Sequence, residues 1–235
     1  MSAGNAASGA IRACFFTPAA SFRDPMFPGV PRCLPVPPPS TLRGMLAAAT
    51  GRAAEPVPLG VSAYPEGGGV DDETYHPVST DGSNPAARGR VAAVKGGMTI
   101  RSRPFLAWLH VTIWVPDPDA GRIASALRRP VWALRIGRSQ DLAYLRSVTR
   151  VVLEPTAEAV VGHALAPPGG HADAGAVTVK LPARISQDRL TTTCHDYLWC
   201  AEPAGRQPVI GAYRDGEQAV WLHPVPPAAC PGTAG

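Results

Sequence analysis

The chain has 235 residues with 24 Gly and 27 Pro, yet 45% of its residues are hydrophobic, which excludes disorder throughout and predicts a buried core. It has no run of about 18 apolar residues, and its first residues lack the basic start and apolar stretch of a signal peptide, so we expect a cytoplasmic protein without a membrane span. The formal net charge is only +4, so a charged binding surface would require an uneven distribution of charge.

The first predicted elements are a strand and a helix. Residues 10–16 alternate as a half-buried strand does. After an irregular loop, Ser40 is predicted to cap a helix that Gly51 closes in the left-handed conformation. The buried face of this helix is predicted from apolar residues at helical spacing, namely Leu42, Met45, Leu46 and Ala49. Arg43 and Gly44 are predicted to stand on its outer edge.

The next region contains two predicted strands separated by a stretch without strong periodicity. The strands are expected at residues 57–64 and 105–115. Residues 65–104 are expected to form a long basic loop or hairpin, a thumb-like region. Within it, residues 88–95 and 98–103 flank Gly96-Gly97 and are predicted to pair with each other.

A second helix and two further strands complete the predicted domain. Asp119 is expected to cap a helix at residues 120–129, which Pro130 ends. The strands are expected at residues 131–136 and 147–153, with a glycine turn at 137–142 between them.

The order strand–helix–strand–strand–helix–strand is typical of the ferredoxin-like (RRM-like) arrangement, an antiparallel sheet with two helices on one face. The predicted fold class is therefore α+β, with this domain at residues 9–154 and the thumb-like region inserted in it. Short strands expected at 177–185 and 219–225 predict a small β-rich C-terminal extension at 155–225. The two ends are expected to be flexible, at residues 1–8 and 226–235.

Basic residues are concentrated in the middle of the chain. Residues 82–140 contain ten basic and two acidic residues, a net charge of +8, whereas the rest of the chain carries −4. Such asymmetry is the electrostatic footprint of a polyanionic partner. Arginine makes up 20 of the 22 basic residues, which a GC-rich genome would also produce.

The cysteines argue against a disulfide framework and a structural zinc site. There are five, an odd number without CxxC spacing: Cys14, Cys33, Cys194, Cys200 and Cys230. A metal site built from Cys194-His195 and Cys200 with His163 or His171 would have spacings unlike those of common zinc modules. We therefore predict no metal and no cofactor.

Three segments carry a family resemblance. They are Ser21-Phe22-Arg23, the proline-led helix at residues 34–51, and Ile136-Gly-Arg-Ser-Gln-Asp-Leu142. In this order, they resemble CRISPR-associated protein 5, a subunit of the type I Cascade effector in the RAMP superfamily, and the proline-rich segment is most similar to the type I-B flavour. The resemblance spans about residues 11–153. It implies a partner RNA, the 5′ handle of the guide crRNA, and two partner proteins, the Cascade large subunit and the backbone subunit.

Under this resemblance we predict that basic side chains, one helix edge and the glycine turn bind RNA. The predicted residues are Arg23, Ser40, Arg43, Arg88, Arg90, Lys95, Arg101, Arg103, Gly137, Arg138 and Ser139. Arginines would neutralise phosphates, while Gly137 permits close backbone approach and the amide of Ser139 helps to hold a phosphate. Three alternatives stay open: the turn closes on itself through Ser139 and Asp141, Arg43 is a solvated surface cation, and residues 88–103 are a solvated loop.

The strand at residues 105–115 places Trp108, His110 and Trp114 on one face. This pattern is typical of a platform on which bases stack, or of a surface packed beneath another part of the chain or a neighbouring subunit.

The residue content argues against catalysis. One branch of the similar family processes its guide precursor with a tyrosine, a lysine and a histidine. Here Lys95 and Lys180 are the only lysines, neither adjoins a histidine, and Tyr75-His76 lacks a lysine beside it. We predict no catalytic residues. The alternatives are a metal-independent endoribonuclease that processes crRNA repeats and a purely structural protein-interaction module.

Overall fold

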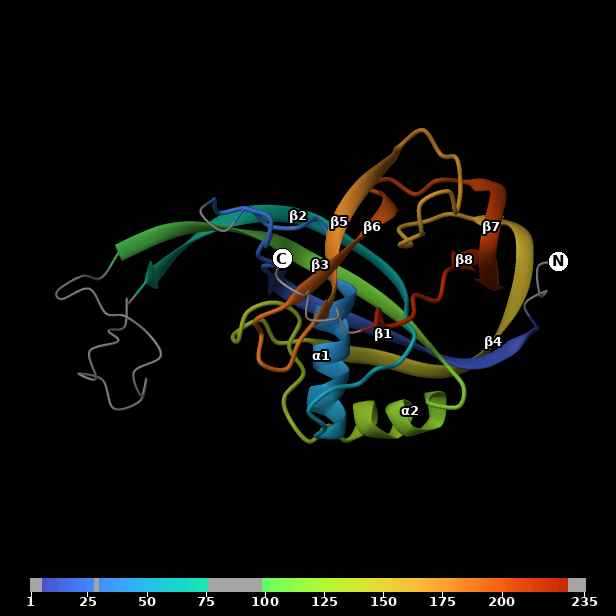
Figure 1. Cartoon of the computed structure of the whole chain (residues 1–235), viewed down its shortest axis with the longest axis horizontal. Helices are drawn as coiled ribbons and strands as arrows, with labels where there is room; N and C mark the ends of the chain where they lie inside the picture. Colours follow the sequence, from blue (N-terminus) through green and yellow to red (C-terminus); the bar gives the residue numbers. More distant parts are fainter. Residues whose placement is uncertain (1–5, 28–29, 76–98, 228–235) are drawn as a thin grey trace, which may run out of the picture.

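A computed structural model describes residues 6–27, 30–75 and 99–227 of the chain. Its centre is a mostly antiparallel sheet of six strands (Figure 1). In spatial order the strands are β2 (Gly60–Tyr75), β3 (Thr99–Pro116), β1 (Ser8–Ala20), β4 (Tyr144–Val160), β7 (Arg206–Asp215) and β8 (Gln218–Val220). Because β1 lies between β3 and β4 and pairs antiparallel with both, the predicted ferredoxin-like arrangement and α+β class are confirmed.

Two helices, α1 (Pro39–Thr50) and α2 (Ala120–Arg128), cover one face of this sheet (Figure 1). Alternate residues of β1 point toward them, and Ile11, Ala13 and Phe15 share one core with Leu42 and Leu46 of α1. The predicted apolar face of the first helix is therefore confirmed.

The ends of the helices differ from the predicted capping pattern. Pro38 occupies the N-cap of α1 and Pro39 the first turn, where a missing N–H costs no hydrogen bond. Gly51 has φ 71° and closes α1 in the left-handed conformation, as predicted. Asp119 precedes α2 without capping it through its side chain, which instead accepts a hydrogen bond from Arg122 at 2.6 Å.

The segment after α2 is not the predicted strand at residues 131–136. Its first two amides, those of Val131 and Trp132, donate to the carbonyls of Ala49 and Ala48 at the end of α1. These bonds satisfy carbonyls that a helix end leaves open and divert the backbone from strand pairing. Residues 131–143 therefore form a loop with a single β-bridge between Arg135 and Leu142.

The paired strands β2 and β3 form a long ribbon that projects beyond the rest of the sheet (Figure 1). Their pairing runs from Gly60 opposite Trp114 to Tyr75 opposite Thr99. Residues 99–103 pair with 71–75, because β2 continues far past the predicted end of its strand. Residues 88–95 lie outside the described residues.

The C-terminal part contains more strands than the two that the sequence predicts. A two-stranded sheet forms from β5 (Ala176–Ile185) and β6 (Thr192–Cys200), and β7 and β8 extend the main sheet. The predicted strand at 177–185 is confirmed, whereas that at 219–225 is reduced to β8. β4 runs through the predicted boundary at residues 154 and 155. Leu181, Ala183, Tyr197 and Trp199 join the same core as α1, so this part packs on the first helix.

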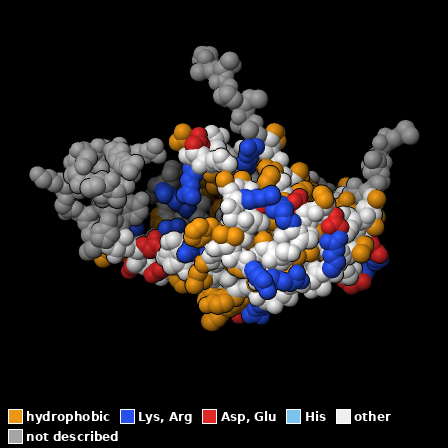
Figure 2. Space-filling view, turned by 90° about the horizontal axis from the view of Figure 1, so that it is seen from below, with side chains coloured by type: hydrophobic (Ala, Val, Ile, Leu, Met, Phe, Trp, Pro, Cys, Tyr) orange, Lys and Arg blue, Asp and Glu red, His pale blue; other side chains and the backbone are white. Residues whose placement is uncertain are grey.

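The excess of basic residues at positions 82–140 is partly neutralised in the folded chain. Arg103, Arg122 and Arg138 of the basic stretch pair with carboxylates that lie outside it in the sequence, among them Glu55 and Glu73. On the face seen from below, basic side chains are spread in several groups with acidic ones among them (Figure 2). None of the helices in the described ranges is both long and apolar enough to cross a membrane.

Candidate functional site

The glycine turn after α2 folds back on the end of β1. Gly137 has φ 117°, and a Cβ atom there would lie 2.6 Å from Asp141 Oδ2 and 3.0 Å from the backbone N of Ser21. The same carboxylate oxygen accepts hydrogen bonds from the amides of Ser21 at 3.1 Å and Arg138 at 2.7 Å. Glycine is therefore required here, but the close approach that it allows is to the chain itself. Of the alternative in which Ser139 and Asp141 close the turn, the structure shows the contact of Asp141, whereas the Ser139 hydroxyl bonds to the side chain of Gln140.

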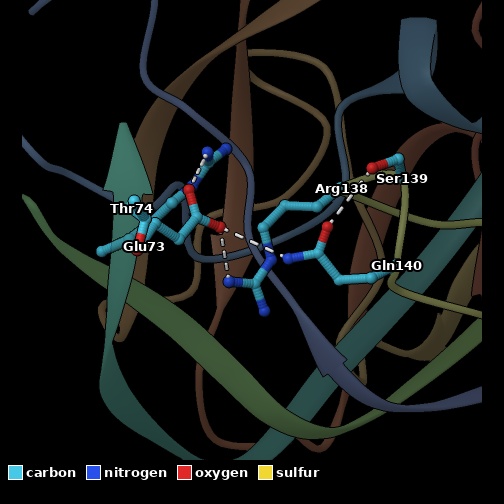
Figure 3. A pocket seen from close by; sticks show the side chains of 6 residues that line it. Glu73, Thr74, Arg138, Ser139 and Gln140 are labelled. Atoms are coloured by element: carbon cyan, nitrogen blue, oxygen red, sulfur yellow. Dashed lines mark hydrogen bonds and ion pairs between the residues drawn. The ribbon is translucent and has the colours of Figure 1, made fainter. Parts of the chain in front are cut away.

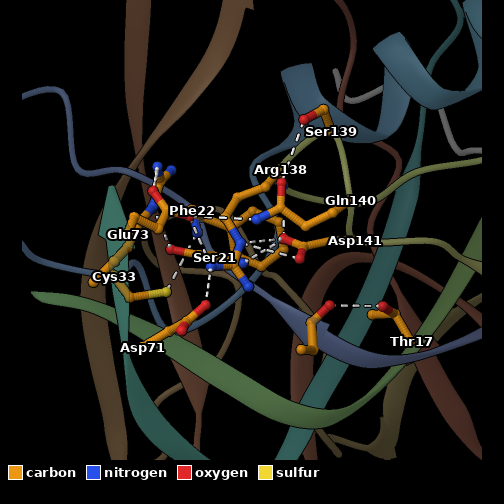
Figure 4. Close-up of polar contacts among 12 residues, drawn as sticks. Thr17, Ser21, Phe22, Cys33, Asp71, Glu73, Arg138, Ser139, Gln140 and Asp141 are labelled. Carbon is orange, nitrogen blue, oxygen red and sulfur yellow. Dashed lines mark hydrogen bonds and ion pairs between the residues drawn. The ribbon is translucent and has the colours of Figure 1, made fainter. Parts of the chain in front are cut away.

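The side chain of Arg138 is held by three carboxylates (Figure 4). Its Nε lies 3.1 Å from Asp141 Oδ1, and its Nη1 lies 3.0 Å from Asp71 Oδ2 and 2.8 Å from Glu73 Oε1. Burial alone would lower the pKa of Arg138, but the hydrogen bond to Glu73 and the charge of Asp141 raise it above its ordinary value. The guanidinium is thus fixed at the point where the turn meets β2.

Arg103 joins the same network from β3. Its Nη1 donates to Glu73 Oε2 at 2.8 Å, and its Nε donates to Ser21 Oγ at 3.2 Å. The Ser21 hydroxyl in turn donates to the carbonyl of Pro104 at 2.8 Å. Although burial opposes the shift, hydrogen bonds from Arg103 and Arg138 hold the pKa of Glu73 below its ordinary value. Glu73 therefore bridges the two arginines.

An open cavity of about 500 Å³ lies over this network (Figure 3). Its lining residues come from the ribbon and the turn, namely Glu73, Thr74, Arg103, Arg138, Ser139 and Gln140. Ser139 is exposed at the rim, and its hydroxyl donates to the amide oxygen of Gln140 at 3.3 Å. We call the set Arg103, Arg138, Asp71, Glu73 and Asp141 the arginine–carboxylate cluster. It has two guanidinium groups and three carboxylates, so it can bind an anion only if a carboxylate gives up an arginine.

The other predicted RNA-binding residues are dispersed. Arg101 is exposed on β3 opposite Glu73 in the strand register, and Arg23 is exposed in the loop after β1, where its backbone forms a bridge with Cys33. Arg88, Arg90 and Lys95 lie outside the described residues. The structure thus brings Arg103, Gly137, Arg138 and Ser139 together.

The predicted position of Arg43 on the outer edge of the first helix is wrong. The residue is only 7% exposed, and its guanidinium donates to the carbonyls of Val57, Ala183 and His223 at 2.8–2.9 Å. Burial lowers its pKa to about 10. The C-terminal part covers the helix side that sequence periodicity leaves exposed, so Arg43 ties that part to α1 and does not contribute to the open cavity.

Ser40 is likewise misplaced by the sequence analysis. Because the helix begins at Pro39, two residues before the predicted start, Ser40 lies inside α1, and its Oγ is buried without a hydrogen-bond partner in the described part of the chain. It is therefore neither a cap nor part of an exposed edge.

The described residues that were considered for catalysis and metal binding do not all lie together at one site. His110 Nε2 lies 2.6 Å from Glu66 Oε1, and Lys180 Nζ lies 3.8 Å from Asp196. The predicted pair Tyr75-His76 extends beyond the described side chains. Across residues 6–27, 30–75 and 99–227, no group of three or more His, Cys, Asp or Glu side chains is placed to hold a metal ion.

Sequence reasoning missed the acidic half of the cluster. Asp71 and Glu73 belong to the run Asp71-Asp72-Glu73, the one acidic run in a region predicted as a basic arm. Alternation along a strand would have placed Asp71 and Glu73 on one face with Asp72 on the other. This alternation is visible in the sequence, but it defines an acidic face only if the strand continues past Gly69, where a loop or hairpin was predicted.

Comparison with known proteins identifies the family. The model of the family described as CRISPR-associated protein (Cas_Cas5) matches residues 10–202. No curated protein matches the sequence. A similar solved structure is a chain of a CRISPR RNA-guided surveillance complex, with 21% identity over 85% of this chain and 91% of that chain and a TM-score of 0.55, a likeness in fold.

Two further solved structures are less similar. A CRISPR protein from Archaeoglobus fulgidus has 13% identity over 92% of this chain and 99% of its own, with a TM-score of 0.47. A Cas protein has 17% identity over 83% and 98%, with a TM-score of 0.45. Because the family match extends over most of the residues, from β1 to the end of β6, this chain belongs to the CRISPR-associated protein family Cas5.

Proposed function

We propose that the chain is a non-catalytic subunit of a type I CRISPR effector complex, Cascade, and that it binds the 5′ handle of the guide crRNA. Membership of the Cas5 family supports this proposal, as does the shared fold with a chain of a CRISPR RNA-guided surveillance complex. The observation that carries it is that Arg103 and Arg138 meet at an open cavity beside the projecting ribbon.

The cluster suggests how a phosphate would be held. Asp71 is half exposed and Glu73 lines the cavity, whereas Asp141 is buried and fixed by two backbone amides. A phosphate oxygen would therefore replace Asp71 or Glu73 on Arg138, while Asp141 keeps the guanidinium in place. Guanidinium groups suit this exchange because they bind phosphates and carboxylates in the same planar geometry.

Binding of a repeat-derived RNA tests the proposal. We expect the chain to prefer this RNA over one of scrambled sequence, and the affinity to fall steeply with salt because phosphate contacts release counterions. Arg103→Ala and Arg138→Ala should each weaken binding about ten- to a hundredfold, in line with the roughly 1.5–3 kcal/mol of a charge-assisted contact. Arg214→Ala is the matched control, since this exposed arginine lies on the distant strand β7, where it pairs with Glu154 of β4.

Several outcomes would contradict the proposal. Equal affinity for repeat-derived and scrambled RNA would exclude recognition of the handle. Unchanged affinity in both Arg103→Ala and Arg138→Ala would exclude the cluster from the RNA-binding site. Thermal unfolding of each variant separates lost contacts from lost folding. Incubating the purified chain with precursor RNA in the absence of divalent metal tests the endoribonuclease alternative, which predicts cleavage products on a gel.

We also propose that the chain joins the Cascade large subunit to the backbone subunits, as the family resemblance implies. Copurification of both partners with this chain after nuclease treatment tests this role. A purely structural interaction module would copurify equally well but would show no crosslinks between RNA and the arginine–carboxylate cluster.

A further inference from the structure

A row of aromatic side chains crosses the sheet on the face opposite the helices. Alternate residues of β1 face the core, so Phe16 points to the other side, and in the strand register it lies opposite His110 of β3 and Tyr144 of β4. His110 is in turn opposite Tyr64 of β2. Four strands thus contribute to one surface, which we call the aromatic row and which also includes Trp108.

The rings of the aromatic row support one another. Tyr64 stacks on His110 with centroids 4.8 Å apart, and Phe16 stacks on Trp108 at 5.6 Å. The guanidinium of Arg146 lies 4.6 Å from the ring centroid of Phe16, a cation–π contact. The surface therefore consists of rings already ordered before any partner binds, which lowers the entropy cost of binding.

Trp108 is held outward by an unusual backbone conformation. Its φ is 51°, and the strand register skips it, since Ala107 and Leu109 pair with Ala19 and Thr17. A large residue in the left-handed region is strained, and irregularities of this kind re-aim side chains next to functional sites. Trp108 is 53% exposed.

Trp114 on the same strand shows the contrast. It is 3% exposed, and its Nε1 donates to Asp215 Oδ2 at 2.8 Å. Of the two functions that the sequence leaves open for this face, packing within the chain thus applies to Trp114. The ring of Trp108 packs on Phe16, itself a member of the row, and stays about half exposed.

We propose that the aromatic row, including the exposed ring of Trp108, binds unpaired bases of single-stranded RNA, an inference that rests on the proposed function. RRM-type sheets stack bases on aromatic rings of the face opposite their helices, and every base offers a π-face to such a ring. Arg146 adds a cation to the same surface. Arg103 lies five residues from Trp108 along β3, about 16 Å, and alternation assigns it to the face of Leu109, opposite the aromatic row, so the row is a site separate from the cluster.

Two probes separate base stacking from phosphate binding. The first is a dodecameric oligouridylate, and the second is an abasic chain of the same length, which keeps the phosphates and lacks the bases. The variant is Trp108→Gly, because glycine adopts φ 51° without strain and removes only the ring. Trp108→Asn is a second variant that tolerates this conformation. Trp132→Ala is the matched control, since Trp132 is 65% exposed in the loop after α2.

We expect Trp108→Gly and Trp108→Asn to weaken oligouridylate binding at least about fivefold and to leave abasic binding unchanged. Trp132→Ala should change neither. Ultraviolet crosslinking of oligouridylate to a peptide that contains Trp108 would give direct support.

Unchanged oligouridylate affinity in both folded variants, or equal loss for both probes, would overturn the inference. If Arg138→Ala still weakened binding of repeat-derived RNA, the proposed function would stand without the aromatic row. Loss of a copurifying protein partner from Trp108→Gly, with RNA affinity intact, would make this face a protein interface and overturn the inference as well.

Discussion

Arg43 and Arg138 are two nearly buried guanidinium groups that differ in their acceptors. Arg43 is 7% exposed, and the side chain of Arg138 is also 7% exposed. Arg43 donates to three backbone carbonyls, whereas Arg138 is surrounded by the carboxylates of Asp71, Glu73 and Asp141. Exposure alone therefore does not distinguish them, but the charge of their partners does.

The difference in partners implies a difference in role. Backbone carbonyls are fixed by the fold and neutral, so burial dominates and lowers the pKa of Arg43 to about 10. Carboxylates carry the charge that a phosphate also carries, and those of Asp71 and Glu73 sit on side chains that can move away from Arg138. Arg43 is thus a structural cation, while Arg138 is the cation that, under the proposed function, would exchange an internal carboxylate for a phosphate.

The largest expected effect is the loss of stability in Arg43→Ala. The substitution removes the hydrogen bonds of Arg43 to three carbonyls, of which that of His223 keeps the amide of Leu59 as a donor, and should lower the free energy of unfolding by about 3–5 kcal/mol. Urea unfolding measures this change, and Arg52→Ala, which removes an exposed arginine 3.7 Å from Glu55, should change it by less than about 1 kcal/mol. A similar small change for both variants would refute the structural role of Arg43.

The Arg43 region should also lose stability in acid. Burial lowers the pKa of His223 from 6.5 to about 4, helped by the charge of Arg43. Below about pH 6.5 the unfolded chain takes up a proton on this histidine, whereas the folded chain does so only near pH 4. The stability that neutral His223 contributes is therefore fully present above pH 6.5 and is lost progressively as the pH falls toward 4. Between pH 7 and 5 the loss should be about 2 kcal/mol.

Urea unfolding of His223→Gln at both pH values isolates this contribution. The variant should be less stable at pH 7 and should lose less on acidification, because glutamine does not titrate. His195→Gln, in which an exposed histidine of β6 is replaced, should keep the full acid loss. An equal acid loss in all three proteins would exclude His223 as the cause.

At the arginine–carboxylate cluster, removing a charge should strengthen RNA binding. Glu73→Gln keeps one acceptor oxygen, enough for one of the two arginines, and removes the charge that competes with phosphate, so we expect the affinity for repeat-derived RNA to rise about three- to tenfold. Asp72→Asn is the matched control: it removes the same charge one residue away, where the side chain accepts a hydrogen bond from Ser102. Equal gains in affinity in both variants would indicate a general charge effect. A lower RNA affinity in Glu73→Gln than in the unchanged protein would mean that Glu73 positions the arginines.

Local patterns predicted those parts of the fold that depend on neighbouring residues. The apolar spacing of α1, its end at Gly51 and the order of elements around β1 follow from periodicity and backbone preference. The extent of β2, the loop at residues 131–143, and β6 and β7 depend on distant partners. Val131 bonds to the end of α1, for example, and no pattern within residues 131–136 shows that bond.

The residues of the candidate site likewise fall into those that local patterns predict and those that only the fold brings together. The requirement for glycine at position 137 was predictable from the residue type, but its neighbours Ser21 and Asp141 meet only in the fold. Arg43 was predicted to face outward because an isolated helix has one buried face. The C-terminal part, which supplied no motif, buries the second face through Ala183 and His223.

The smallest expected effect distinguishes two buried serines. The Ser40 hydroxyl is buried without a partner in the described ranges, so Ser40→Ala removes a group whose burial is uncompensated and should leave stability within about 0.5 kcal/mol or raise it. A helix cap at this position would instead cost about 1 kcal/mol. Ser21→Ala removes a hydroxyl that donates to Pro104 and accepts from Arg103, and should cost about 1–3 kcal/mol in urea unfolding. A loss of about 1 kcal/mol or more in Ser40→Ala would indicate that Ser40 caps the helix and would contradict the start of α1 at Pro39. A neutral Ser40→Ala beside a costly Ser21→Ala would show that hydrogen-bond partners, and not burial, decide how much a polar group contributes to stability.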